Sequence, residues 1–313
     1  MSMTLTDVSK LTEEEARDTF ERVRWPSGPV CHRCGSVEVT KLAGEAHRAG
    51  LYDCRGCKEQ FSSTTGTILE QSHLPIRTWL MAFAILCSSK KGVSALQLQR
   101  QLELGSYRTA WHMAHRIRHA MSQEPLAGLL GAGGGTVEVD EAYIGGKPRH
   151  PQGPPKGPKH SRRGRGTKKT PVVALVERDG RARSWPVKRV DSATLKDAIR
   201  KHVDLSARII TDELNVYHGI GAEFEGGHET VNHSEREYVR GDVHSNTIEG
   251  FFALLKRGVY GSFHHVSPQH LHRYCDEFSF RWDHRKIDDA ERIAEAIKGA
   301  EGKRLNYRKP IKR

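Results

Sequence analysis

"TVEVDEAYIG", residues 136–145, alternates apolar and polar side chains, which is the pattern of a β-strand with one buried face. A glycine-rich stretch precedes it, so we expect a new domain to begin there. Because successive side chains of a strand point to opposite faces, Asp140 shares its face with Glu138 and Ala142. This stretch therefore predicts the first strand of a domain, and it carries an acidic side chain.

The segments that follow predict further strands and a helix. Residues 171–190 contain two strand-like runs joined by an Asp-Gly dipeptide at 179–180, which is typical of a hairpin turn. Residues 192–203 predict a helix, and residues 206–220 begin with a strand that ends at Asp212. The order is strand, strand, strand, helix and strand, and a further helix follows later in the chain.

This order predicts an α/β fold with a ribonuclease-H-like mixed sheet and flanking helices, as in retroviral integrases. In such a sheet the first and fourth strands are neighbours. Asp140 and Asp212 are then expected to lie close together, although 71 residues separate them in the sequence.

"HSNTIEGFFALLKRG", residues 244–258, predicts an amphipathic helix. Its apolar stripe consists of Ile248, Phe251, Phe252, Leu255 and the following Val259. The opposite side carries Asn246, Glu249, Ala253, Lys256 and Tyr260. Most polar strips of this kind are simply solvated, so Glu249 becomes a candidate catalytic acid only in combination with the two aspartates.

Asp140, Asp212 and Glu249 together would suit phosphodiester chemistry. Attack on a phosphodiester develops charge on the attacking and leaving oxygens, and two Mg²⁺ ions about 4 Å apart can stabilise both. Such hard cations prefer carboxylate oxygens as ligands. Each aspartate alone could instead be an ordinary strand-end acid, and Asp212 could cap a helix. The adjacent Glu141 or Glu213 could also be the true ligand.

Four cysteines have the spacing of a zinc ribbon. Cys31 and Cys34 form one CxxC pair, and Cys54 and Cys57 form a second, with 19 residues between the pairs. Each pair can supply two adjacent corners of a tetrahedron. We expect one structural zinc ion, because four protein ligands leave no open position for catalysis. Two unrelated CxxC pairs are the alternative. The remaining cysteines are expected in the core: Cys87 and Cys275.

Residues 94–123 predict two helices that are joined by a tight turn at Gly105, in the manner of a helix-turn-helix. The second helix carries Arg108, Arg116 and Arg118, which are candidates for contact with DNA phosphates. A plain helical hairpin with a solvated basic face is the alternative. Two earlier helices are also expected: residues 11–25, which open with a capping box, and the apolar residues 74–92.

The chain of 313 residues has a net charge of +12 and a pI near 9.5, which indicate a polyanionic partner such as nucleic acid. A ribosomal or membrane surface would also fit this charge. No apolar run approaches the roughly 20 residues of a membrane span, and the N-terminus lacks the order of a signal peptide. We expect a cytoplasmic protein.

Residues 147–170 form a basic insertion with five prolines, nine Lys or Arg and no acid, so they cannot build a core. The expected domains are therefore residues 1–70 with an N-terminal helix and the ribbon, 71–125 with the helical segment, 135–290 with the catalytic sheet and its insertion, and 291–313 as a basic tail. The insertion and the tail are candidate accessory DNA-binding segments, and solvated loops are the simpler interpretation of both.

The chain resembles the DDE transposases of bacterial insertion sequences, in the family that couples an N-terminal zinc ribbon to an integrase-like (ISXO-type) catalytic domain. The matching stretches follow the family order over roughly residues 25–285: "CHRC" with "CRGC", "VEVDEAYIGGK", "IITDELNVY" and "HSNTIEGFFALLKRGVYGSFHHVS". The four stretches together are far more specific than a CxxC pair alone.

This resemblance implies three ligands for two Mg²⁺ ions, or for Mn²⁺ in their place: Asp140, Asp212 and Glu249. It also implies that Lys256, about 10.5 Å along the helix from Glu249, contacts substrate DNA, and Arg257 beside it is a further candidate. Some relatives replace the third acid, so Asn246 remains a candidate for a metal or DNA contact.

We therefore expect a transposase that binds the terminal inverted repeats of its element, cuts DNA there, and joins the freed 3′-hydroxyls to target DNA. Because two ends must be handled together, a homo-oligomer on double-stranded DNA is expected, associated with the nucleoid of a bacterium. Two rival hypotheses are a non-catalytic DNA-binding regulator derived from a transposase and a ribonuclease-H-like nuclease.

Overall fold

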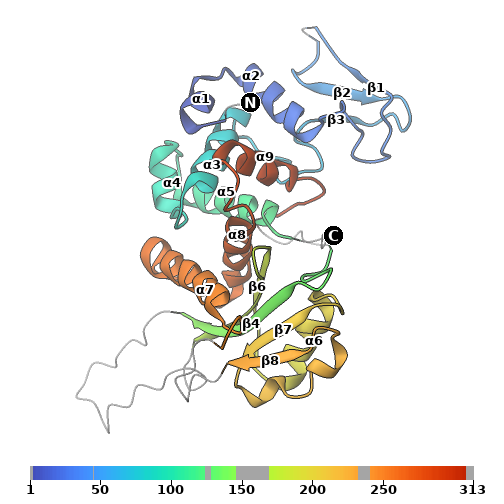
Figure 1. Ribbon diagram of the computed structural model, residues 1–313. Coiled ribbons are helices and arrows are strands. Elements are labelled where there is room, and N and C mark those ends of the chain that lie inside the picture. Colours follow the sequence, from blue (N-terminus) through green and yellow to red (C-terminus); the bar gives the residue numbers. More distant parts are fainter. Residues whose placement is uncertain (1–2, 45, 124–127, 146–168, 232–239, 308–313) are drawn as a thin grey trace, which may run out of the picture. The chain divides into compact units, whose positions relative to one another are not determined.

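The computed structural model describes residues 3–44, 46–123, 128–145, 169–231 and 240–307 (Figure 1). The chain divides into two compact units, one formed by Met1–Ser122 with His284–Arg313 and the other by Gln123–Asp283. Within the described ranges, no helix is long and apolar enough to cross a membrane. Most of the predicted basic insertion, residues 147–168, lies outside the described residues.

The first unit contains a helical bundle and a small sheet (Figure 1). Its helices are α1 (Leu5–Lys10), α2 (Glu13–Arg24), α3 (Ile76–Ser88), α4 (Ala95–Gln101), α5 (Tyr107–Ala120) and α9 (Asp289–Lys298). Helices α1, α2, α5 and α9 all contact the apolar helix α3. The predicted capping box is confirmed at the start of α2, where Thr12 and Glu15 exchange side-chain and backbone hydrogen bonds.

Helix α9 changes the predicted domain boundaries. The sequence-based boundaries assigned residues up to 290 to the catalytic domain and treated 291–313 as a tail. In the structure, His284–Arg313 belongs to the first unit, and α9 packs on α2, α3 and α5. The reason is the apolar stripe of α9, whose Ile293, Ala296 and Ile297 are buried.

Helices α4 and α5 contact each other across a short turn, so the predicted pair of helices is confirmed. The residue of the turn with a left-handed backbone is Glu103, with φ of 51°, rather than Gly105. Each helix begins at a serine N-cap, Ser94 and Ser106, whose hydroxyl accepts a backbone N–H of the first turn. At the turn itself, the Ser106 cap fixes the start of α5, and Gly105 is not in the left-handed region.

The small sheet is antiparallel, with strands β1 (Val39–Lys41), β2 (Leu51–Cys54) and β3 (Gln60–Ser62) in the order β1-β2-β3. Three aromatic residues, Trp25, Tyr52 and Phe61, form its core together with Cys31 and Cys54. The ring centroids of Tyr52 and Phe61 are 5.7 Å apart, and Trp25 meets both rings edge-on. This core includes Cys54 at the end of β2 and Cys31 of the first CxxC pair, so it joins both pairs of cysteines to the sheet.

The second unit is built on a five-stranded mixed sheet. Its strands are β4 (Thr136–Ile144), β5 (Thr170–Glu177), β6 (Ala182–Pro186), β7 (Arg208–Asp212) and β8 (His228–Val231), and its helices are α6 (Ser192–His202), α7 (Asn246–Gly258) and α8 (Leu271–Asp283). Short helices complete it: Asn215–Tyr217, Gly221–Glu223, the π-helix Val259–Phe263 and Pro268–His270.

The strand order is β6-β5-β4-β7-β8. Strands β4, β5 and β6 are antiparallel neighbours, whereas β7 is parallel to both β4 and β8. The first and fourth strands are therefore adjacent, and the predicted ribonuclease-H-like mixed sheet is confirmed. Strand β8 was not predicted, because its four residues, "HETV", contain one apolar side chain and no alternating pattern.

Helices cover the two faces of this sheet with separate cores. Helices α7 and α8 pack on one face, where Ala142 and Ile144 of β4 meet Phe251 and Phe278. Helix α6 packs on the other face, against Val137 and Val139 among others. Successive side chains of β4 thus alternate between the two cores: those of Val137 and Val139 point toward α6, and those of Ala142 and Ile144 point toward α7 and α8.

Candidate active site

Asp140 and Asp212 lie side by side in the second unit. The parallel register of β4 and β7 pairs Val139 with Thr211, so the next residue of each strand is an aspartate. Neighbouring strands are about 4.8 Å apart, and the pleat directs both side chains to the face that α7 covers. The prediction that these two acids meet on adjacent strands is confirmed.

The electrostatics of Asp140 show how close these charges are. Burial, the Asp212 carboxylate and the Glu141 carboxylate, in that order, raise the pKa of Asp140 from 3.8 to about 8. Two opposing influences are weaker: the Glu141 backbone N–H, which donates to Asp140 Oδ1 at 2.7 Å, and the positive charge of Lys256. Asp140 therefore holds a proton at neutral pH in this arrangement.

Helix α7 presents the polar strip that its sequence predicts. Asn246, Glu249, Ala253, Lys256 and Tyr260 are exposed, whereas the five residues of the apolar stripe are buried. The stripe packs against β4 and β5, which fixes the rotation of the helix about its axis. The positive charge of Lys256 lowers the pKa of Asp140. Lys256 is therefore near enough to the two aspartates to act on them electrostatically.

The structure does not assemble a complete set of three carboxylates. Within the described residues, the four cysteines are the one group of three or more His, Cys, Asp or Glu side chains whose ligand atoms lie close enough to hold a metal ion. Asp140 and Asp212 are brought together, and Glu249 remains on the exposed strip of α7. The role of Glu249 therefore stays a prediction.

A buried acid that the sequence reasoning did not use connects β4 to α7. Glu138 is fully buried, and its Oε2 accepts the backbone N–H of Ile248 in the first turn of α7 at 2.9 Å. Its Oε1 accepts Arg178 Nε at 2.8 Å. Arg178 also donates to the backbone oxygens of Asp242 and His244, just before the helix. This pair anchors the start of α7 beside Asp140.

Glu141 faces the opposite side of the sheet from Asp140. The hydroxyl of Tyr217 donates to Glu141 Oε2 at 3.2 Å, and Tyr217 is buried in the α6 core. Burial and then the charges of Glu141, Asp140 and Asp212 raise the pKa of Tyr217. Of the two alternative ligands, Glu141 is therefore held by Tyr217, and Glu213 lies just beyond the end of β7.

The four predicted zinc ligands converge in the first unit. The Sγ atoms of Cys31, Cys34, Cys54 and Cys57 all lie within 4.8 Å of one another, and two of the sulfur pairs are 3.6 and 3.5 Å apart. Tetrahedral zinc with Zn–S bonds of about 2.3 Å needs sulfurs about 3.8 Å apart. The four thiols therefore fit a structural zinc ion.

The two CxxC turns share one backbone geometry. The N–H of Gly35 donates to the Cys31 oxygen, and the N–H of Lys58 donates to the Cys54 oxygen, both at 2.9 Å. Gly35 and Lys58 have φ of 73° and 61°. The left-handed position of the second turn is thus occupied by Lys58, a residue that is not glycine.

Two of the predicted DNA-contacting arginines are buried. Arg116 and Arg118 are 7% and 2% exposed, so they do not lie on the basic outer face that was expected of this helix. Arg116 donates to the Glu70 carbonyl, and its guanidinium lies 5.4 Å from the centre of the Trp79 ring. Arg108, at the start of the same helix, and Arg257, on α7, are exposed as predicted.

Comparison with protein families follows the division of the chain. Residues 132–283 match the ISXO2-like transposase domain, and residues 11–60 match the transposase zinc-ribbon domain. Both matched models describe domains of IS1595-type transposases. The transposase domain coincides with the sheet and helices α6 to α8, and the ribbon match includes all four cysteines.

The chain is also similar to known proteins outside these family models. An uncharacterised protein in transposable element ISH50 of Halobacterium salinarum is 29% identical over 277 residues, which are 87% of this chain and 91% of the relative. This relative is archaeal, so the similarity does not restrict such proteins to bacteria.

Crystal structures of the Mos1 strand transfer complex and of a pre-cleavage Mos1 transpososome are 15% and 16% identical, with TM-scores of 0.27 and 0.26. Those alignments cover 69% and 68% of this chain and 72% and 75% of the other chains. The fold assignment rests on the strand order alone.

Proposed function

We propose that this transposase is a DDE-type enzyme that binds the terminal inverted repeats of its insertion sequence, cuts DNA strands there, and joins the freed 3′-hydroxyls to target DNA. The observation that carries the proposal is the pair of aspartates, Asp140 and Asp212, on adjacent strands within the matched transposase domain. Paired carboxylates on one sheet face suit metal-assisted attack on a phosphodiester, which needs no protein nucleophile.

Asp140, Asp212 and Glu249 are the proposed ligands of two Mg²⁺ ions, which Mn²⁺ could replace. When bound, such ions activate the attacking oxygen and stabilise the charge that develops on the leaving oxygen. The donor set fits these hard cations, because it consists of carboxylate oxygens. The raised pKa of Asp140 supports the same role, since part of it comes from a neighbouring carboxylate whose repulsion a cation would relieve. Asp140 would release its proton as a cation binds.

The exposed strip of α7 would orient the DNA. Lys256 and Arg257 are proposed to contact phosphates, and Asn246 is proposed to contact either the metal or the DNA backbone. Lys256 is suited to this position because its charge already acts on Asp140. Glu138 holds the helix that carries these residues, so it is a positioning residue rather than a catalytic one.

End recognition is assigned to the first unit, through the zinc ribbon and the α4–α5 pair with the exposed Arg108. The net charge of +12 supports binding to DNA. A homo-oligomer is proposed because two transposon ends have to be joined together. Location at the nucleoid, in the cytoplasm of the host, follows from the same DNA-bound role.

The test uses full-length protein, Mg²⁺ and a duplex that carries the ends of the element, with unrelated duplex as the comparison. Strand transfer to target DNA is the expected result. Binding without cutting would indicate a regulator, and cutting that ignores the end sequence would indicate a nuclease. Asp140→Ala, Asp212→Ala and Glu249→Ala should each abolish cutting and leave end binding intact. The matched control is Asp179→Ala in the β5–β6 turn, which should cut normally. Retained activity in Glu249→Ala would transfer the third role to Asn246 or another residue.

A further inference from the structure

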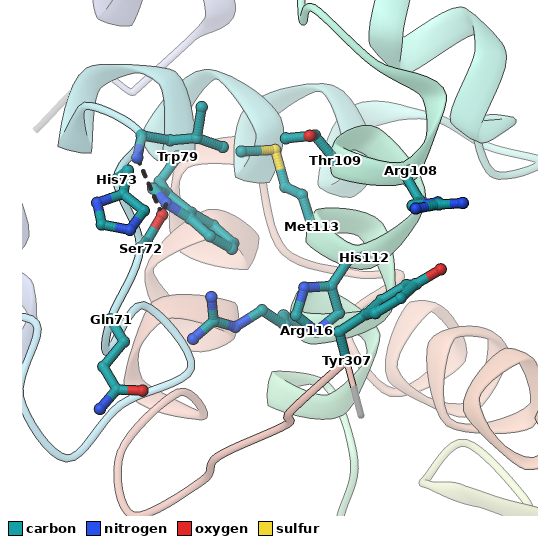
Figure 2. Close-up of a pocket in the computed structure, with 11 residues that line it drawn as sticks. Gln71, Ser72, His73, Trp79, Arg108, Thr109, His112, Met113, Arg116 and Tyr307 are labelled. Atoms are coloured by element: carbon teal, nitrogen blue, oxygen red, sulfur yellow. Dashed lines mark hydrogen bonds between the residues drawn. The ribbon is translucent and has the colours of Figure 1, made fainter. Parts of the chain in front are cut away.

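The first unit contains a pocket that none of the proposed catalytic or zinc residues line. The cavity has a volume of about 410 Å³. Figure 2 shows its lining side chains, which come from α3 and the segment before it, from α5, and from the segment near the C-terminus. Its lining residues are Gln71, Ser72, His73, Leu74, Trp79, Arg108, Thr109, His112, Met113, Arg116 and Tyr307. A cavity of this size and largely apolar lining is typical of a site for a small ligand group.

One wall of the pocket contains a buried hydrogen-bond donor that is not satisfied. Arg116 is 7% exposed, and its Nη2 donates to the Glu70 carbonyl. Its Nε is buried and has no hydrogen-bond partner among the described residues. Leaving a buried donor of a charged group unpaired is costly, so a ligand with an acceptor atom would stabilise this site.

The other walls are flat and aromatic. The rings of His112 and Tyr307 meet edge-on with centroids 5.4 Å apart, and Tyr307 is 49% exposed. The segment that bears Tyr307 is held to α5, since His112 Nε2 lies 3.2 Å from the carbonyl oxygen of Leu305. On the far side, the Trp79 ring is fixed by its hydrogen bond to Ser72 Oγ at 2.9 Å (Figure 2). These two contacts hold the aromatic walls in place.

The charge at the entrance is positive. Arg108 is exposed at the start of α5 and lines the pocket. Glu70, which precedes the lining residue Gln71, is already paired with Arg304 at 3.1 Å. A ligand that joins a flat ring with acceptor atoms to an anionic group would satisfy the aromatic walls, the Arg116 donor and the charge of Arg108 together.

We propose that this pocket receives one unstacked nucleobase of the bound DNA. A base offers a flat face to Tyr307, while its phosphate meets Arg108. Its carbonyl or ring-nitrogen acceptors meet Arg116 Nε once the wall that covers this atom shifts aside. The inference rests on the proposed function, since it requires DNA to lie along α5. It also assigns a role to the C-terminal segment, which supplies Tyr307.

The test measures binding of full-length, zinc-loaded protein to duplexes that carry the ends of the element, in which one nucleotide at a time is replaced by an abasic site. Wild type, Tyr307→Ala and the control Tyr107→Ala are compared. Tyr107 is as exposed as Tyr307, at 52%, and lies on the same helix as Arg108 outside the pocket lining. Zinc content and thermal unfolding confirm that the variants are folded.

The expected result is that Tyr307→Ala weakens binding to the intact end about tenfold or more, and that this loss disappears when one particular nucleotide is abasic. Arg116→Lys, which keeps the charge and removes Nε, should show the same dependence on the same nucleotide. Tyr107→Ala should show no such positional dependence. A loss that is equal for every abasic duplex, or no loss, would overturn the pocket assignment alone. Failure of the wild type to prefer end DNA over unrelated duplex would overturn the proposed function and the pocket assignment together.

Discussion

Replacing Asp140 with asparagine should stabilise the protein at alkaline pH. The folded state raises the pKa of this carboxyl from 3.8 to about 8, so between these values the folded chain holds a proton that the unfolded chain has released. Stability is then lost as pH rises from about 4 to about 8. Asparagine cannot ionise, and its side-chain oxygen can still accept the Glu141 backbone N–H.

The magnitude follows from the size of the shift. A displacement of about 4 pKa units at about 1.4 kcal/mol per unit sets an upper bound of about 5 to 6 kcal/mol above pH 8. The carboxyl is half-buried, so water that reaches it reduces this value. Between pH 6 and pH 8 the stability difference between the variant and the wild type should widen by about 2 kcal/mol.

The assay is urea unfolding of both proteins at pH 6, 7, 8 and 9 without added Mg²⁺. Asp179→Asn is the control, because it makes the same chemical change at an exposed turn of the same unit and should show no widening difference. A difference that stays constant with pH would refute the reasoning, because it would mean that burial and Asp212 do not raise the pKa of Asp140. Adding Mg²⁺ at pH 8 should stabilise the wild type and not Asp140→Asn, as expected for binding to the folded state alone.

Three further predictions concern the residues around this site and the ribbon. Glu138→Ala should lower the free energy of unfolding by about 3 to 5 kcal/mol, because it leaves Arg178 without its buried partner. Urea unfolding measures this change, and a loss below about 1 kcal/mol would contradict the buried ion pair. Tyr217→Phe should cost about 1 kcal/mol by the same measurement, through the lost hydrogen bond to Glu141, and an unchanged midpoint would show that this bond contributes nothing. Cys54→Ser should reduce the zinc content from one ion per chain to near zero, as measured by metal analysis. Full retention of zinc would refute the four-cysteine site.

The sheet could be predicted from the sequence because its signals are local and strong. The alternation of residues 136–145 and the Asp-Gly turn at 179–180 both appear in the structure. Together with one helix and one more strand, they determined which strands are neighbours. The meeting of Asp140 with Asp212 followed from that topology, before any side-chain detail was known.

The burial of Arg116 and Arg118 could not be predicted in the same way. An arginine stem is apolar, so its guanidinium can lie over a ring such as Trp79 while one nitrogen donates to a backbone oxygen. Which face of α5 is buried depends on α3 and on α9, which lie far away in the sequence. The pocket depends on the same long-range packing, because Tyr307 reaches it from the opposite end of the chain.

The buried position of Glu138 could have been predicted from the alternation of residues 136–145. It occupies the same face of β4 as Asp140 and Ala142, and an acid on a face that packs against a helix needs a buried partner. The structure supplies two partners, Arg178 Nε and the Ile248 N–H. The second of these bonds ties the first turn of α7 to a point two residues before Asp140. Glu249 follows Ile248 directly in this first turn, so the bond that holds Ile248 to β4 also holds the backbone of Glu249 beside the strand that carries Asp140.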